Sequence, residues 1–158
     1  MYKRSYKYDN NFGLNEEKKI LPILEKFFGE TIVRSQNIYD KWDGAGKNTL
    51  YEIKSRTNKS NAFNDTIIAA NKIIDTDKEQ IFIFNFTDGI YYIKYDVSLF
   101  DTFDNSPFVR NEREDIVDEI KQYYYIPVKL LTLIEKKDTP TSVNNFFNPM
   151  KGRCLIQL

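Results

Sequence analysis

One short segment, WDGAGKNTLYEIKSR over residues 42–56, combines acidic and basic residues with a pattern typical of a buried strand. Side chains alternate between the two faces of a strand, so Glu52 and Lys54 point to the same side. Asp43 precedes a glycine-rich turn, and a hairpin across that turn would bring it beside Glu52. The spacing therefore indicates a cluster of two carboxylates and one ammonium group.

A third carboxylate can come from the segment before this hairpin. Residues 14–28 have apolar side chains at helical spacing, and Glu17 falls inside the apolar arc of that helix, whereas Glu16 lies nearer its edge. A Glu that faces a sheet must be paired, protonated or bound to a cation. The alternative is that Glu17 is a first-turn acid that favours the helix dipole.

Carboxylates gathered in this way need a counter-charge. Two like charges about 4 Å apart repel by roughly 4 kcal/mol at an effective dielectric of 20, and Lys54 alone cannot cancel three of them. The chain has no histidine and a single cysteine, Cys154, so an all-oxygen site for Mg²⁺ or Mn²⁺ fits better than a zinc site. Such an ion activates water and stabilises charge on a phosphate, which predicts metal-assisted hydrolysis of phosphodiester bonds.

The elements that must position these residues follow from periodicity and turn signals. We expect helices over residues 14–28, 63–74 and 111–124, strands over residues 31–34, 39–43, 49–56, 80–86, 90–95 and 124–134, and an irregular tail from residue 135. This order predicts a single α/β domain, with a central mixed β-sheet flanked by helices. Residues 1–13 would form an N-terminal arm, residues 14–86 the catalytic core, and residues 87–158 the C-terminal strands, helix and tail.

The arrangement resembles the PD-(D/E)XK nuclease superfamily. Asp43, eight intervening residues and then Glu52-Ile53-Lys54 follow a helix that carries Glu17. The resemblance implies a restriction endonuclease-like core of helix, three strands, helix and strand over roughly residues 14–86. One departure is the tryptophan at position 42, where the name-giving proline would stand.

The resemblance also implies roles for these residues. Asp43 and Glu52 would be metal ligands, the backbone carbonyl of Ile53 a further ligand, Lys54 catalytic, and Glu17 the supplementary acid of the first helix. Members of the superfamily often place a lysine or glutamine on the helix after this strand, which suggests Lys72 as a phosphate contact or auxiliary catalytic group. Arg56, Lys47 and Asn71 are candidate contacts to nucleic acid.

Simpler interpretations stand beside these. Glu-x-Lys also begins at Glu16, Glu17, Glu119 and Glu135, and an ordinary edge-strand charge pair would explain the copy at Glu52 as well. Asn71 and Lys72 could lie on a helix edge that borders solvent. The tyrosines at positions 123–125 could stack on bases, although packing in a sheet explains them better. Arg110 and Arg113 could grip phosphates or pair with neighbouring acids.

The composition limits the partners. The 158 residues include 23 basic and 23 acidic ones, so a polyanion must be held by a local patch. The N-terminus lacks the apolar core of a secretory signal and no run approaches the length of a membrane span, which predicts a cytoplasmic protein without a membrane partner. The sequence therefore predicts a small Mg²⁺-dependent DNA endonuclease. A homodimer is a further possibility, because cutting both strands of a duplex often needs two copies of the active site.

Two other functions stay open at this point. The first is an RNA endonuclease on the same fold; it is less favoured because viral RNA-cleaving enzymes of the superfamily often add a histidine ligand, which this chain lacks. The second is a non-catalytic nucleic-acid-binding or assembly module, in which the charged cluster is a leftover or a structural ion network.

Overall fold

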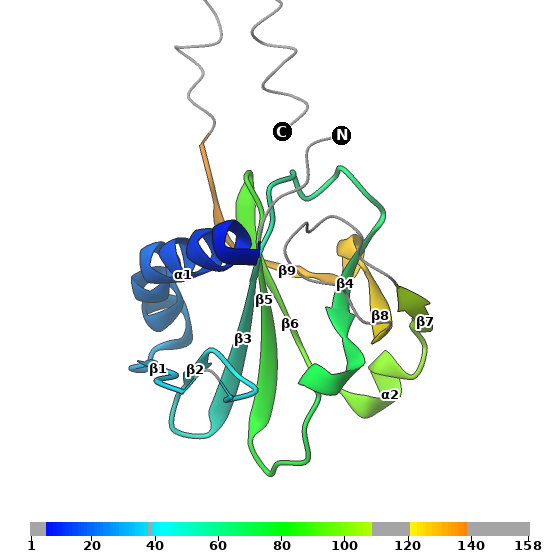
Figure 1. Cartoon of the computed structure of the whole chain (residues 1–158), viewed down its shortest axis with the longest axis horizontal. Coiled ribbons are helices and arrows are strands. Elements are labelled where there is room, and N and C mark those ends of the chain that lie inside the picture. Colours follow the sequence, from blue (N-terminus) through cyan, green and yellow to red (C-terminus); the bar gives the residue numbers. More distant parts are fainter. Residues whose placement is uncertain (1–5, 38, 109–120, 139–158) are drawn as a thin grey trace, which may run out of the picture.

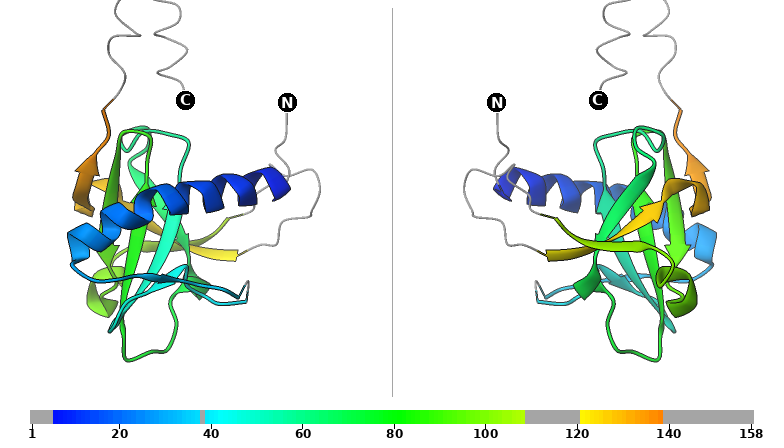
Figure 2. Two further views of the ribbon diagram at one scale, coloured as in Figure 1. Left: turned by 90° about the vertical axis from the view of Figure 1, so that its left-hand side faces the viewer. Right: turned by 90° about the vertical axis from the view of Figure 1, so that its right-hand side faces the viewer.

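The computed structural model describes residues 6–37, 39–108 and 121–138, and these form a single α/β domain. A mixed sheet stands at the centre (Figure 1). The helix α1 (Tyr6–Phe28) covers one face, and a smaller antiparallel sheet lies on the other side. Figure 2 shows that α1 crosses the strands of the central sheet instead of running along them. No helix in the described ranges is long and apolar enough to cross a membrane.

The larger sheet has six strands in the order β1-β2-β3-β5-β6-β9. β3 and β5 are parallel, and all other neighbouring strands are antiparallel. In the parallel pair Glu52 lies beside Phe82. The strands are β1 (Val33–Arg34), β2 (Gly44–Ala45), β3 (Thr49–Ser55), β5 (Glu79–Asn85), β6 (Gly89–Lys94) and β9 (Thr132–Lys136).

The smaller sheet has three strands in the order β4-β8-β7, and all are antiparallel. They are β4 (Asp65–Ala69), β8 (Lys121–Pro127) and β7 (Asp104–Phe108). Short helices connect the sheets: η1 (Ala70–Lys72) follows β4, α2 (Val97–Phe100) follows β6, and η2 (Val128–Leu130) joins β8 to β9.

The alternation of side chains along β3 and β5 builds a core on each face of the central sheet. On the α1 face, Tyr51 and Ile53 of β3 pack with Ile20 and Leu24 of α1. On the other face, the aromatic side chains of β5 pack with residues of the smaller sheet and α2, namely Phe82, Phe84, Ile68, Phe100 and Ile126. Glu52 lies one residue out of phase with Tyr51 and Ile53, so it points to the side of the smaller sheet.

The first helix is longer than predicted. Residues 6–13 continue α1 toward the N-terminus, so the expected arm over residues 1–13 is wrong for these residues; residues 1–5 lie outside the described part. The helix ends where expected, because Gly29 adopts a positive φ of 71° that a glycine tolerates best.

The predicted second helix over residues 63–74 is wrong. This segment forms β4 and the single turn η1, and β4 pairs with β8 through Ile68 and Tyr124. The β-branched run Thr66-Ile67-Ile68 suits a strand once a partner strand is present. The restriction endonuclease-like αβββαβ core is therefore not confirmed, although α1, the β1–β3 meander and the parallel β5 are in place.

Other boundaries differ as well. The strand predicted over residues 39–43 is wrong, since β2 is formed by the next two residues. The strand predicted over residues 124–134 is two strands, β8 and β9, which η2 separates and which belong to different sheets. Of the helix predicted over residues 111–124, residues 121–124 belong to β8 and the remainder lies outside the described part. The tail predicted from residue 135 begins inside β9, and residues 139–158 are outside the described part.

The strands predicted over residues 31–34, 49–56, 80–86 and 90–95 are confirmed to within two residues as β1, β3, β5 and β6. Among these strands, β3 holds Glu52 and Lys54, and β5 is its parallel neighbour in the sheet.

Candidate active site

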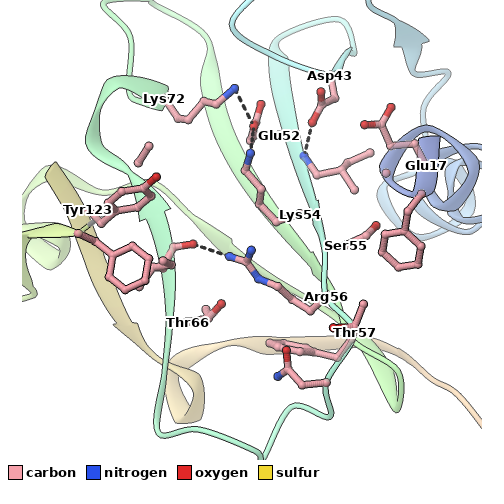
Figure 3. Close-up of a pocket in the computed structure, with 18 of the residues that line it drawn as sticks. Glu17, Asp43, Glu52, Lys54, Ser55, Arg56, Thr57, Thr66, Lys72 and Tyr123 are labelled. Carbon is pink, nitrogen blue, oxygen red and sulfur yellow. Dashed lines mark hydrogen bonds and ion pairs between the residues drawn. The ribbon is translucent and has the colours of Figure 1, made fainter. Parts of the chain in front are cut away.

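Glu52 lies in the middle of β3 and is only 4% exposed. Two ammonium groups contact one of its oxygens: Lys54 Nζ lies 2.9 Å from Oε1 and Lys72 Nζ lies 3.1 Å from the same atom (Figure 3). The other oxygen, Oε2, is buried and has no hydrogen-bond partner among the described residues. A carboxylate oxygen left in this state is costly, because each one can accept two hydrogen bonds or bind a cation.

Asp43 lies beside β3, directly before β2. Its backbone N–H donates to the carbonyl of Tyr51 over 2.8 Å, and its Oδ2 accepts from the backbone N–H of Ile53 over 2.7 Å. Burial is the main cause that raises the pKa of Asp43, and together with the negative charges of Glu52 and Glu17 it raises this pKa to about 7, against the hydrogen bond from Ile53 and the charge of Lys54. The structure therefore brings Asp43, Glu52 and Lys54 together, as the hairpin argument predicts.

Glu17 extends from α1 toward Asp43 (Figure 3). Burial is the main cause that raises its pKa, and the charge of Glu52 acts in the same direction, whereas Arg34 lowers it. Arg34 Nη2 lies 3.4 Å from Glu17 Oε2. Because α1 begins at Tyr6, Glu17 stands well inside the helix, and its interpretation as a first-turn acid is wrong.

Lys72 reaches the site from an unexpected element. It is the last residue of η1, which follows β4, and its ammonium group comes from the side opposite Glu17 (Figure 3). The simpler interpretation, a helix edge that borders solvent, fits Asn71, which is exposed on η1. It is wrong for Lys72, which is half-buried and pairs with Glu52. Asn71 and Lys72 both line the groove.

The two remaining candidate contacts behave differently. Arg56 lines the groove, but its Nη2 donates to the carbonyl of Ile67 over 2.6 Å and its guanidinium lies 5.8 Å from the centre of the Phe84 ring. Arg56 thus ties the end of β3 to β4. Lys47 does not line the groove; it lies in the turn between β2 and β3, where its backbone N–H donates to Glu30.

The groove around Glu52 has a volume of about 1280 Å³. Its walls come from the N-terminal half of α1, the loop before β2, β3, the loop after β3, and the smaller sheet. Pockets for small molecules usually measure about 300–1,000 Å³, so this space suits an elongated ligand better than a compact one.

The chain matches no protein-family model, no curated protein and no solved structure with which it was compared. The case for a function therefore depends on the residues of the groove themselves.

A divalent ion can be tested against these residues. Among the described residues, no group of three or more potential ligand side chains is arranged to hold a metal ion. Asp43 accepts from the N–H of Ile53 and Glu17 from Arg34. Mg²⁺ usually takes only one or two carboxylates and keeps several waters. Asp43 and Glu52 supply that number of carboxylates, and Oε2 of Glu52, although buried, has no partner among the described residues. The role of the Ile53 carbonyl as a further ligand stays a prediction.

One charged residue of the site was missed by the sequence reasoning. Arg34 ends β1 and pairs with Glu17, and its Nε is buried without a hydrogen-bond partner among the described residues. The only signal in the sequence was a basic residue at the end of a short apolar run, which is too common to indicate a site.

Proposed function

We propose that this chain is a Mg²⁺-dependent phosphodiesterase that hydrolyses DNA in the manner of PD-(D/E)XK endonucleases. One observation carries the proposal. A carboxylate that is 4% exposed contacts two lysines through one oxygen and no described residue through the other, beside a second carboxylate whose pKa is raised to about 7. Buried carboxylates with perturbed pKa values, placed close together in a groove, are typical of functional sites.

Each residue then has a role. Asp43 and Glu52 hold the ion, with Glu17 as the supplementary acid, and a bound Mg²⁺ supplies Lewis-acid stabilisation of phosphate charge and a more acidic water. Lys54, anchored on Glu52, orients the attacking water. Lys72 approaches Glu52 from the side opposite Glu17 and would contact a phosphate oxygen of the substrate. Asn71 lines the same groove and is kept as a contact to the strand.

The proposal is tested by incubating circular single-stranded DNA and supercoiled plasmid with the protein and Mg²⁺ or Mn²⁺. Glu52→Ala and Lys54→Ala should each lower the cleavage rate by roughly 100-fold or more, because each removes a group that acts in the transition state. Glu79 and Lys94 serve as the control, because they form an exposed Glu–Lys ion pair outside the groove, with 2.7 Å between Lys94 Nζ and Glu79 Oε1.

Glu79→Ala and Lys94→Ala should cut like the unchanged protein. Undiminished cutting by both Glu52→Ala and Lys54→Ala would remove the assignment. RNA of matched sequence, digested in parallel, tests the RNA endonuclease alternative, which keeps the same residues and changes only the substrate.

A second candidate function is a non-catalytic module with a structural ion network. The contacts of Lys54 and Lys72 with Glu52 favour it, since two ammonium groups already compensate one carboxylate. The two functions differ in whether the groove takes up a divalent ion, so binding of Mn²⁺ separates them.

A further inference from the structure

Three large aromatic side chains lie exposed along the groove that contains Glu52. Tyr39 is 83% exposed, Phe63 is 68% exposed and Phe108 is 37% exposed, and all three line the groove. They come from separate parts of the chain: the loop before β2, the loop between β3 and β4, and the last residue of β7. A single exposed aromatic residue is ordinary, but three that converge on one groove mark a binding surface.

Other aromatic residues extend this surface into the groove. Tyr123 of β8 lines the groove on the side of the smaller sheet, opposite Glu17 (Figure 3). Phe108 packs edge-to-face on Tyr123, with 5.8 Å between the ring centres and 82° between the ring planes. This contact holds the Phe108 ring at the groove, so little conformational freedom is lost when a ligand binds to it.

The charges in the groove are balanced. Three of its cationic side chains already have partners, because Lys54 and Lys72 contact Glu52 and Arg56 donates to a backbone carbonyl. The described charged residues that line it are the bases Lys41, Lys54, Arg56, Lys72 and Lys121 and the acids Glu17, Asp40, Asp43, Glu52 and Asp65. With a net charge of zero for the whole chain as well, the described groove has no excess of basic residues to attract a polyanion, so affinity must come mainly from other contacts.

We propose that this groove binds a single-stranded stretch of DNA, with unpaired bases stacked on Tyr39, Phe63 and Phe108. The inference rests on the proposed function and names its substrate class. In a duplex the faces of the bases are covered by their neighbours and only the edges are offered. The faces of unpaired bases are free, and stacking on aromatic side chains adds about 1–3 kcal/mol per base and tolerates any sequence.

The experiment measures binding without cleavage. Fluorescence anisotropy in EDTA compares a labelled single-stranded oligonucleotide with the duplex of the same sequence, for the unchanged chain and for Tyr39→Ala, Phe63→Ala and Phe63→Leu. Phe27→Leu is the matched control, because Phe27 is 44% exposed on α1 and does not line the groove. Circular dichroism confirms that each variant is folded.

The single strand should bind more tightly than the duplex, and Tyr39→Ala and Phe63→Ala should each weaken binding by about 5- to 150-fold. Phe63→Leu should weaken binding of the single strand nearly as much as Phe63→Ala, because leucine has no aromatic ring. Phe27→Leu should bind like the unchanged protein. Equal or tighter binding of the duplex would overturn the proposal. Normal binding by both alanine variants would also overturn it.

The assay separates this inference from the proposed function. A preference for single strands that depends on Phe63, in a protein that cleaves nothing with Mg²⁺, would support the inference and contradict the nuclease. Cleavage that depends on Glu52, with binding indifferent to Tyr39 and Phe63, would do the reverse.

Discussion

At the scale of single residues, the main feature of the site is that the two carboxylate oxygens of Glu52 have unequal partners. Two ammonium groups share Oε1, and Oε2 is buried without a partner among the described residues. A purely structural ion pair would satisfy both oxygens, because an unsatisfied buried acceptor costs about 1–3 kcal/mol. The metal ion of the proposed function would remove this cost by binding Oε2.

Asp43 gives a prediction at the same scale. Its pKa is raised to about 7, so the folded chain keeps a proton that the unfolded chain releases near pH 4. Its contribution to stability is then fully present below the pKa of the unfolded state and is lost as the pH rises to about 7. We expect metal-free Asp43→Asn to exceed the unchanged protein in free energy of unfolding at pH 8, by at most about 4 kcal/mol.

The difference should shrink toward pH 4 and is measured by urea unfolding in EDTA across that range. Asp101→Asn, an exposed carboxylate outside the groove, is the control and should show no such trend. A variant less stable than the unchanged protein at pH 8 would contradict the burial of a costly charge at Asp43.

At the scale of elements, the groove exists because a smaller sheet replaces the helix that was expected after β3. β4 and η1 deliver Lys72 to Glu52, and β8 supplies a wall. The loop between β3 and β4 carries Phe63 and is tied to the turn between β5 and β6. In this tie, Ser60 donates from its backbone N–H and its hydroxyl to the carboxylate of Asp88, each over 2.8 Å.

Asp88→Ala should therefore loosen this loop. Ser60 is 8% exposed, so its two donors lose their acceptor in a buried place, and we expect a loss of about 1–3 kcal/mol in the free energy of unfolding. Urea unfolding measures this loss. Asp104→Ala removes a similar bond, from Ser106 at 2.8 Å, on the exposed strand β7 and should cost much less. Equal losses in the two variants would show that the tie does not hold the loop.

At the scale of the whole molecule, the balance of charge and the placement of one groove limit what the chain can do. It carries 23 basic and 23 acidic residues and cannot attract nucleic acid by net charge. Each chain contributes one Glu52 and one Lys54, so under the proposed function one chain would break one strand at a time. Cutting both strands would need two copies, so the homodimer stays a prediction.

Metal binding should be visible in the stability of the whole domain, since an ion that binds only the folded state stabilises it by mass action. With Mn²⁺ at about 100 times its dissociation constant, the gain is about 2.7 kcal/mol, or a rise of several degrees in the unfolding temperature. Glu52→Ala should lose this rise and Glu79→Ala should keep it, in scanning calorimetry with and without Mn²⁺. No rise in the unchanged protein would favour the non-catalytic module.

The sequence by itself determined the features that depend on neighbouring residues. The alternation of side chains in β3 placed Glu52 and Lys54 on one face of the strand. The glycine-rich turn brought Asp43 next to β3, and Gly29 ended α1. These outcomes need only strand alternation, a tight turn and a residue that tolerates a positive φ.

Only the tertiary structure decided the rest. Residues 65–69 became a strand because β8, far along the chain, supplies the backbone partners, and long-range pairing overrides local helical spacing. The same pairing explains why Lys72 reaches Glu52. Arg34 of β1 and Glu17 of α1 also form their ion pair across a long stretch of sequence. The unpartnered oxygen of Glu52 and the aromatic lining of the groove come from segments that are distant in the sequence, so no local pattern contains them.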